Sequence, residues 1–120
     1  MVKLVFCCRR KPELSLEQFQ KRWLDVHGPL VRRLRVSVPQ MKRYVQSHTI
    51  PGAPSETLRA SRGAKEPYDG ITEVWFDSLE ALGASSEQGL AAAQQLYEDE
   101  AEFIDFANSA VFLTEEHEIF

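Results

Sequence analysis

The chain alternates between short apolar runs and longer amphipathic stretches. Four short stretches predict β-strands, and the first of them is rich in β-branched and aromatic residues. They are residues 2–8, 40–50, 71–77 and 110–116. After the first run, apolar side chains recur at spacings of three and four from Leu16 to Leu34, which predicts a helix with one apolar stripe. Ser15 and Gln18 form the S-x-x-Q pattern of a capping box at the start of that helix.

A second helical region precedes the last predicted strand. Ser78 is a suitable N-cap, and residues 78–96 have a helical pattern that is weakened near Gly83 and Gly89. Residues 97–107 continue the helical pattern and place aromatic side chains toward the core. The resulting order is strand, helix, strand, strand, helix, strand. This is the ferredoxin-like arrangement, an α+β fold with a four-stranded antiparallel sheet.

Residues 51–70 have a different composition. They contain three prolines, three glycines and several Ser, Lys and Arg residues. This composition predicts a loop, and its length is unusual for a compact domain, in which such loops are generally functional lids or disordered.

The predicted strands are apolar on both faces. Residues 2–8 and 110–116 have few polar positions, and in residues 71–77 the side chains of Val74 and Trp75 point to opposite faces. Two helices can cover only one face of a four-stranded sheet. The other face therefore needs a second copy of the chain, which predicts a homodimer with sheet packed against sheet.

His27 lies on the apolar stripe of the first helix and is followed at once by Gly28 and Pro29. Proline costs about 3 kcal/mol in a helix interior, so we expect one helix to end near His27 and another to begin with Pro29 in its first turn. An imidazole beside unpaired backbone groups at such a break can act as a general acid or base. The alternative is a structural histidine that satisfies those groups.

The second predicted strand carries a row of polar side chains. Tyr44, Gln46 and His48 alternate and therefore share one face of the sheet. If that face looks toward His27, Tyr44 can donate a hydrogen bond to a developing oxyanion and His48 can relay a proton. Solvent exposure at the strand end is the alternative for His48. Trp75 is a candidate wall of the same pocket, although core packing explains it equally well.

Composition and charge exclude several classes of protein. A length of 120 residues suits one domain, residues 1–120, and 43% hydrophobic residues are enough for a core. A net charge of −4 argues against a nucleic-acid partner, and we interpret the basic cluster at Arg32, Arg33 and Arg35 as a solvated helix face. No apolar run approaches the ~20 residues of a membrane span, so we expect a soluble, cytoplasmic protein.

The sequence contains no recognisable site for a metal or a cofactor. No pair among the three histidines has the local spacing of metal ligands, and the adjacent Cys7 and Cys8 suit neither a zinc site nor a disulfide framework. A phosphate-binding glycine loop is also missing, so no nucleotide cofactor is predicted. We expect neither a metal nor a cofactor.

Four stretches of the chain together resemble the EthD family, named for ethyl tert-butyl ether degradation, within the dimeric α+β barrel group. They are LEQFQKRWLDVHGPLVRRL, MKRYVQSHTI, YDGITEVWFDSLEAL and DEAEFIDFANSAVFLTEEHEIF. The resemblance implies a ferredoxin-like fold whose sheet pairs with that of a second copy to close a barrel. The wider group includes cofactor-free monooxygenases, polyketide cyclases, isomerases and haem enzymes, so the fold leaves the chemistry open.

Two functions are compatible with these observations. The first is a cofactor-independent isomerase, cyclase, dehydratase or oxygenase that binds a small, oxygenated, largely apolar ring compound between sheet and helices. Its catalytic candidates are His27, Tyr44 and His48, and its candidate ligand contacts are Trp23, Gln46, Trp75 and Phe103. The second function is a non-catalytic binding or accessory protein that uses the same pocket to hold a hydrophobic metabolite.

Overall fold

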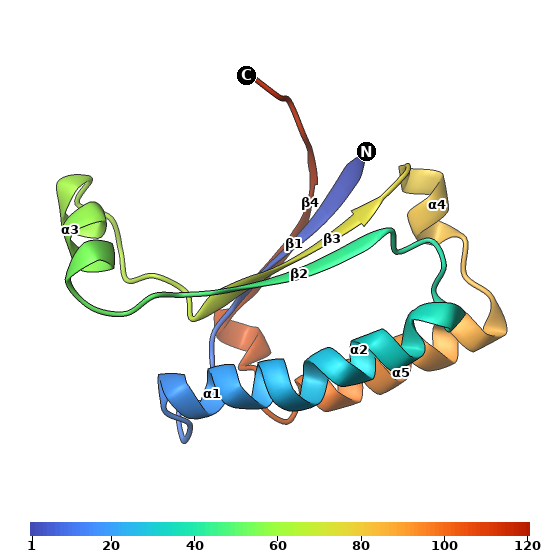
Figure 1. The fold of residues 1–120 in the computed structure, drawn as a ribbon, viewed down its shortest axis with the longest axis horizontal. Coiled ribbons are helices and arrows are strands. Elements are labelled where there is room, and N and C mark those ends of the chain that lie inside the picture. The colour runs from blue at the N-terminus through green and yellow to red at the C-terminus, as the bar shows by residue number, and fades with distance from the viewer.

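The computed structural model describes residues 1–120 as a four-stranded antiparallel sheet with its long helices on one side (Figure 1). The strand order is β2-β3-β1-β4. The strands are β1 (Val2–Cys8), β2 (Arg43–His48), β3 (Gly70–Phe76) and β4 (Ala110–Glu115). All neighbouring pairs are antiparallel, which confirms the predicted α+β, ferredoxin-like fold. The sheet is open, with β2 and β4 at its edges.

The first helical segment is continuous from α1 to a terminal 3-10 turn. It consists of α1 (Leu16–Arg22), a π-helical turn (Trp23–His27), α2 (Gly28–Leu34) and a 3-10 turn (Arg35–Ser37). The predicted capping box is confirmed. Ser15 Oγ accepts from the Gln18 N–H at 3.0 Å, and Gln18 Oε1 accepts from the Ser15 N–H at 2.9 Å.

The second helical region is split in two. It consists of α4 (Leu79–Gly83) and α5 (Glu87–Glu100), each capped by a serine, Ser78 and Ser86 respectively. The break therefore lies between these helices, and Gly89 is inside α5 rather than at a break. The prediction that residues 97–107 continue as a helix is wrong beyond Glu100, since turns and a 3-10 segment (Phe106–Asn108) follow.

The prediction of a loop over residues 51–70 is also wrong in part, because this segment contains the helix α3 (Ala53–Ser61). Gly52 has a φ of 100°, which a glycine adopts without strain, and Pro54 lies in the first turn, where its missing N–H has no cost. The glycine and the proline thus begin a helix here. The helix α3 has no buried residue and lies beyond the ends of β2 and β3, away from the long helices (Figure 1).

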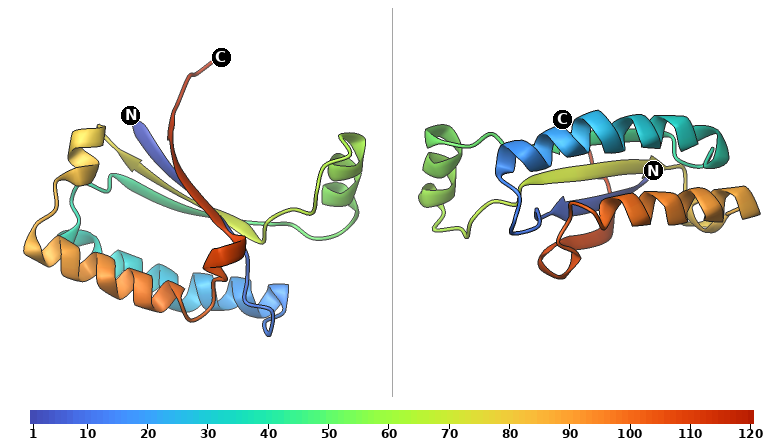
Figure 2. Two further views of the ribbon diagram at one scale, coloured as in Figure 1. Left: turned by 180° about the vertical axis from the view of Figure 1, so that it is seen from behind. Right: turned by 90° about the horizontal axis from the view of Figure 1, so that it is seen from below.

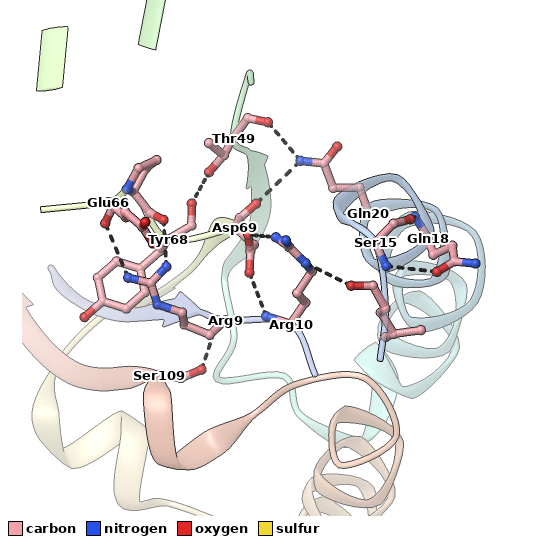
Figure 3. A network of polar contacts seen from close by, with 12 residues as sticks. Arg9, Arg10, Ser15, Gln18, Gln20, Thr49, Glu66, Tyr68, Asp69 and Ser109 are labelled. Carbon is pink, nitrogen blue, oxygen red and sulfur yellow. Dashed lines mark hydrogen bonds and ion pairs between the residues drawn. The ribbon is translucent and has the colours of Figure 1, made fainter. Parts of the chain in front are cut away.

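The connection between β1 and α1 is fixed by a network around Asp69, just before β3 (Figure 3). The buried Asp69 carboxylate accepts from the Arg10 backbone N–H at 2.7 Å and forms an ion pair with the Arg10 guanidinium. Arg10 Nε in turn donates to the Leu14 carbonyl at 2.9 Å, and Gln20 of α1 donates to the Thr49 carbonyl at 2.9 Å. These contacts join the ends of β1, β2 and β3 to the first helix.

The apolar core lies between this end of the sheet and the helices. Its central cluster comes from β1, the first helical segment and the chain after α5. The members of this cluster are Cys8, Phe19, Trp23, Phe103 and Ile104. In Figure 2, α1, α2 and α5 all lie on one face of the sheet. None of the helices is both long and apolar enough to cross a membrane.

The opposite face of the sheet has no helix packed across it. The register pairs Lys3 with Trp75 and Trp75 with Arg43, so these side chains share the face that points away from α1, α2 and α5. The Arg43 guanidinium stacks on the Trp75 ring at 4.7 Å from its centroid. In a single chain, this face of the sheet is open.

Candidate functional site

His27 is held by a π-helical turn, and the predicted helix break does not occur. The backbone stays in the right-handed helical region from Arg22 through Gly28, and the Gly28 N–H donates to the Trp23 carbonyl five residues earlier. The wider turn lets the chain accommodate Pro29, which lacks an N–H, without ending the helix. The Trp23 carbonyl also accepts from Gln46 Nε2 at 3.0 Å, so side-chain and backbone donors both stabilise this turn.

The His27 imidazole is paired with Asp99 near the end of α5. Nδ1 of His27 lies 2.7 Å from Asp99 Oδ2, and Arg22 donates to both carboxylate oxygens of Asp99 at 2.6 and 3.2 Å. The hydrogen bonds from Arg22 are the main reason that the Asp99 pKa is lowered. Since Asp99 is an ionised acceptor, Nδ1 of His27 carries the proton and Nε2 presents a lone pair.

Burial keeps the imidazole neutral and raises the pKa of the neighbouring carboxyl. His27 is 3% exposed, and burial lowers its pKa although Asp99 opposes the shift. Glu100 Oε2 lies 3.6 Å from His27 Nε2. Burial, together with the charge of Asp99, raises the Glu100 pKa to about 7. A neutral imidazole and a carboxyl that titrates near neutrality therefore face each other, an arrangement suited to exchanging a proton.

The polar row on β2 faces the helices. Gln46 Nε2 donates to the Tyr44 hydroxyl at 3.1 Å as well as to Trp23, and Gln46 Oε1 lies 2.8 Å from His48 Nε2. The His48 ring stacks on Trp23 with centroids 4.5 Å apart. Burial raises the pKa of the Tyr44 phenol, although hydrogen bonds such as that from Gln46 oppose the shift. The hydroxyl is therefore neutral and has a proton that it can donate.

The structure brings six of the seven predicted site residues to the same side of the sheet. These are Trp23, His27, Tyr44, Gln46, His48 and Phe103. The Phe103 ring packs edge-on against the His27 imidazole, with the ring centroids 5.4 Å apart. Trp75 is not part of this group, because its register places it on the open face, where Nε1 donates to Glu116 Oε1 at 2.6 Å. The prediction that Trp75 walls the His27 pocket is therefore wrong.

Arg22, Asp99 and Glu100 were not predicted as site residues. The available signal was the position of two acidic residues in the last turn of a helix, where the helix dipole disfavours negative charge. Such a pair needs a cation from elsewhere, and Arg22 of α1 supplies it through an ion pair of 2.6 Å with Asp99. The partner is 77 positions away, so the sequence pattern alone could not identify it.

A hollow of about 910 Å³ lies between α2 and the edge strand β2. Tyr44 and Gln46 line it, as do Gly28 and Pro29, whereas His27 does not. No group of three or more His, Cys, Asp and Glu side chains is arranged to hold a metal ion.

Comparison with known proteins agrees with this fold. The family model described as "EthD domain" matches residues 11–107. An EthD family protein from Bacillus halodurans superposes with a TM-score of 0.62 at 21% identity, covering 98% of this chain and 99% of that one. A protein from Arabidopsis thaliana superposes with a TM-score of 0.63 at 19% identity, covering 100% of this chain and 99% of that one. A dimeric, ferredoxin-like protein of unknown function from Bacteroides fragilis superposes with a TM-score of 0.61 at 13% identity, covering 96% of this chain and 95% of that one. The comparison with curated proteins found no match.

Proposed function

The chain belongs to the EthD family, and from the geometry of its buried polar side chains we propose that it catalyses proton transfer on a small, oxygenated, largely apolar ring compound. The compound binds between the sheet and the helices. His27 is the general base, Tyr44 donates a hydrogen bond to the oxygen that gains negative charge, and Glu100 exchanges the proton with His27.

One observation supports this proposal above the others. The Asp99 carboxylate accepts from Nδ1 of His27 at 2.7 Å, which leaves Nε2 free to accept a proton 3.6 Å from Glu100. A proton taken from a carbon next to a carbonyl moves to Nε2, and the electron pair moves onto the carbonyl oxygen opposite Tyr44. Return of a proton to a carbon of the enolate completes an isomerisation and needs no bound cofactor.

The test is hydrogen–deuterium exchange at carbon. Cyclohexanone and α-tetralone are incubated with the full chain in D₂O, and loss of their α-proton signals is followed by NMR. We expect the wild-type chain to accelerate exchange, and His27→Ala and Glu100→Gln to reduce the acceleration by about 10²-fold or more, the usual contribution of general acid–base catalysis. Glu102→Gln, a change of an exposed acid two residues from Glu100, is the matched control and should exchange like the wild type. Full exchange by His27→Ala contradicts the proposal.

A second candidate function follows from the burial of His27. The imidazole is only 3% exposed and does not line the hollow between α2 and β2. A non-catalytic binding protein, with His27 fixing the π-helical turn and Tyr44 and Gln46 holding the ligand, fits that observation. In this case the wild-type chain binds the ketones without accelerating exchange, and His27→Gln keeps their affinity within about threefold. A large loss of affinity in folded His27→Gln counts against the binding role.

The proposal includes a homodimer in which two open sheet faces pack together and close a barrel. Its support is the uncovered face around Trp75, to which Ile71 and Phe112 add apolar area at 37% and 49% exposure. The relative from Bacteroides fragilis is itself described as dimeric. We place the dimer in the cytoplasm, a compartment in which the free thiols of Cys7 and Cys8 stay reduced.

A further inference from the structure

The hollow between α2 and β2 has a strongly basic entrance. Five of its thirteen lining residues are cationic, and none is acidic. The cationic residues are Arg32, Arg33, Arg35 and Lys42, together with Arg43, whose guanidinium lies on the other face of the sheet against Trp75. The whole chain has 18 acidic and 14 basic residues, so a surface with the four cations Arg32, Arg33, Arg35 and Lys42 and no acid is a marked local exception.

These cations are mostly free of partners within the chain. Arg32, Arg33 and Arg35 make no ion pair and no side-chain hydrogen bond, and the only ion pair of Lys42, with Asp77, is 3.8 Å long. Three guanidinium groups on a short stretch repel one another, and no acid of the chain compensates them. An anion in the hollow would relieve that repulsion.

The hollow also has apolar lining residues, of which Val31 and Val38 are buried. Met41 adds to this apolar lining, and Tyr44 and Gln46 supply its polar, uncharged part. An apolar cavity of about 150 Å³ is enough for benzene. The hollow is several times larger, at about 910 Å³, so it has room for a ring and a chain that reaches the basic entrance.

We propose that the basic entrance recognises the anionic end of an elongated, largely apolar ligand, a carboxylate or a phosphate, whose ring reaches Tyr44 and Gln46. Guanidinium groups suit both anions, because their paired N–H donors match two oxygens at once. This inference rests on the proposed function, since it names the class of compound that the site between sheet and helices accepts. It also gives the arginines of α2 a role beyond that of a solvated helix face.

The experiment compares the affinities of three probes with the same ring and chain length for the full-length protein. The probes are 6-phenylhexanoate, 6-phenylhexyl phosphate and 6-phenylhexan-1-ol, measured by isothermal titration calorimetry at 50 and 300 mM salt. We expect at least one of the two anions to bind ten times more tightly than the alcohol, with the advantage shrinking at high salt as the charges are screened. The tighter of the two anions identifies the headgroup as carboxylate or phosphate.

The charge is then removed from the entrance in the variant Arg32→Gln/Arg35→Gln/Lys42→Gln. All three side chains are exposed, so the fold tolerates the change. The variant should lose the tenfold preference for the anion and keep the affinity for the alcohol. The control, Lys21→Gln/Arg62→Gln/Lys65→Gln, removes the same charge from exposed positions outside the hollow and should keep the preference.

Three results overturn the inference: equal affinity for anions and alcohol, a preference that survives in the entrance variant, or no binding of any probe. Each is an equilibrium binding result that requires no turnover. The proposed proton transfer fails by a different readout, unchanged exchange in His27→Ala, so the two failures are distinguishable.

Discussion

Glu100 links the buried site to the stability of the fold. Its carboxyl has a pKa of about 7 in the folded chain against an ordinary value of 4.5, because burial disfavours the charged form. The folded state therefore keeps the proton over a pH range in which the unfolded state releases it. The stabilisation is complete below about pH 4.5 and is lost as the pH rises through about 7.

Glu100→Gln removes this dependence, because an amide does not ionise. From pH 5 to pH 8, we expect the free energy of unfolding of the variant to rise by roughly 1–3 kcal/mol relative to that of the wild type. The figure is discounted for solvent screening, because the Glu100 side chain is 25% exposed. Urea unfolding at the two pH values measures the difference. Glu102→Gln should unfold in parallel with the wild type at both, and a Glu100→Gln curve that also runs parallel would contradict the assignment.

Gly70 shows a second constraint at a single residue, this time from packing. A Cβ added at Gly70 would overlap the six-membered ring of the fully buried Trp23 and would lie 2.9 Å from the Ser47 carbonyl oxygen. Gly70→Ala should therefore destabilise the fold by about 1–3 kcal/mol, the usual cost of overpacking. Gly83→Ala is the control, since nothing lies within 4 Å of its Cβ position, and thermal unfolding should find it as stable as the wild type or slightly more so.

At the scale of elements, periodicity predicts most of the secondary structure, and the exceptions have physical causes. The four strands and the start of α1 follow from local apolar spacing and a cap, which depend on neighbouring residues only. The helix α3 was missed because Gly52 and Pro54 indicate a loop by composition, although they occupy the positions that begin a helix. Proline likewise suggested a break after His27, where a π-helical turn continues the helix.

That π-helical turn explains why one face of the first helix stays buried over its whole length. Phe19, Trp23, His27 and Val31 are buried at intervals of four. Four residues exceed one 3.6-residue turn, so such a repeat drifts round an α-helix by about 40° per step. The π turn needs more than four residues per turn and reverses the drift between Trp23 and His27. His27 therefore points at Asp99 and Phe103.

Sequence alone predicts the arrangement of candidate-site residues only where a regular alternation of side chains along a strand determines it. Alternation along β2 places Tyr44, Gln46 and His48 on one face, as observed. Alternation also separates Trp75 from them, but only once the register between β2 and β3 is known. The pairing of His27 with Asp99 joins positions 72 apart, and no local pattern contains that information.

The network around Asp69 joins the end of β1 to the start of β3, and we expect it to stabilise the fold (Figure 3). Asp69→Ala leaves the Arg10 guanidinium and backbone N–H without their buried acceptor, so we expect a loss of roughly 2–4 kcal/mol in the free energy of unfolding. Chemical denaturation measures it. Asp25→Ala removes an exposed ion pair with Lys21 on α1 and should cost less than about 1 kcal/mol. Equal losses in the two variants would show that the network does not join the elements.

For the whole molecule, the decisive property is the unequal covering of the two faces of the sheet. One face is packed by α1, α2 and α5 (Figure 2). The other face leaves the apolar side chains of Ile71 and Phe112 open to solvent. The homodimer proposed above would cover that area and would account for the apolar pattern on both faces of the strands. We therefore expect light scattering at 10 µM to give about twice the chain mass of 13.7 kDa.

Phe112→Glu tests which face forms the dimer. Phe112 pairs with Val5 of β1 on the open face and is 49% exposed, so a carboxylate there would be buried without a partner in the dimer. We expect this variant to be monomeric at 10 µM with an unchanged far-UV circular dichroism spectrum. Val111→Glu places the same charge one residue earlier, where the side chain is 60% exposed and points to the helix side, and it should remain dimeric. A monomeric wild type would contradict the dimer, and dissociation by Val111→Glu alone would place the interface on the other face, against the helices.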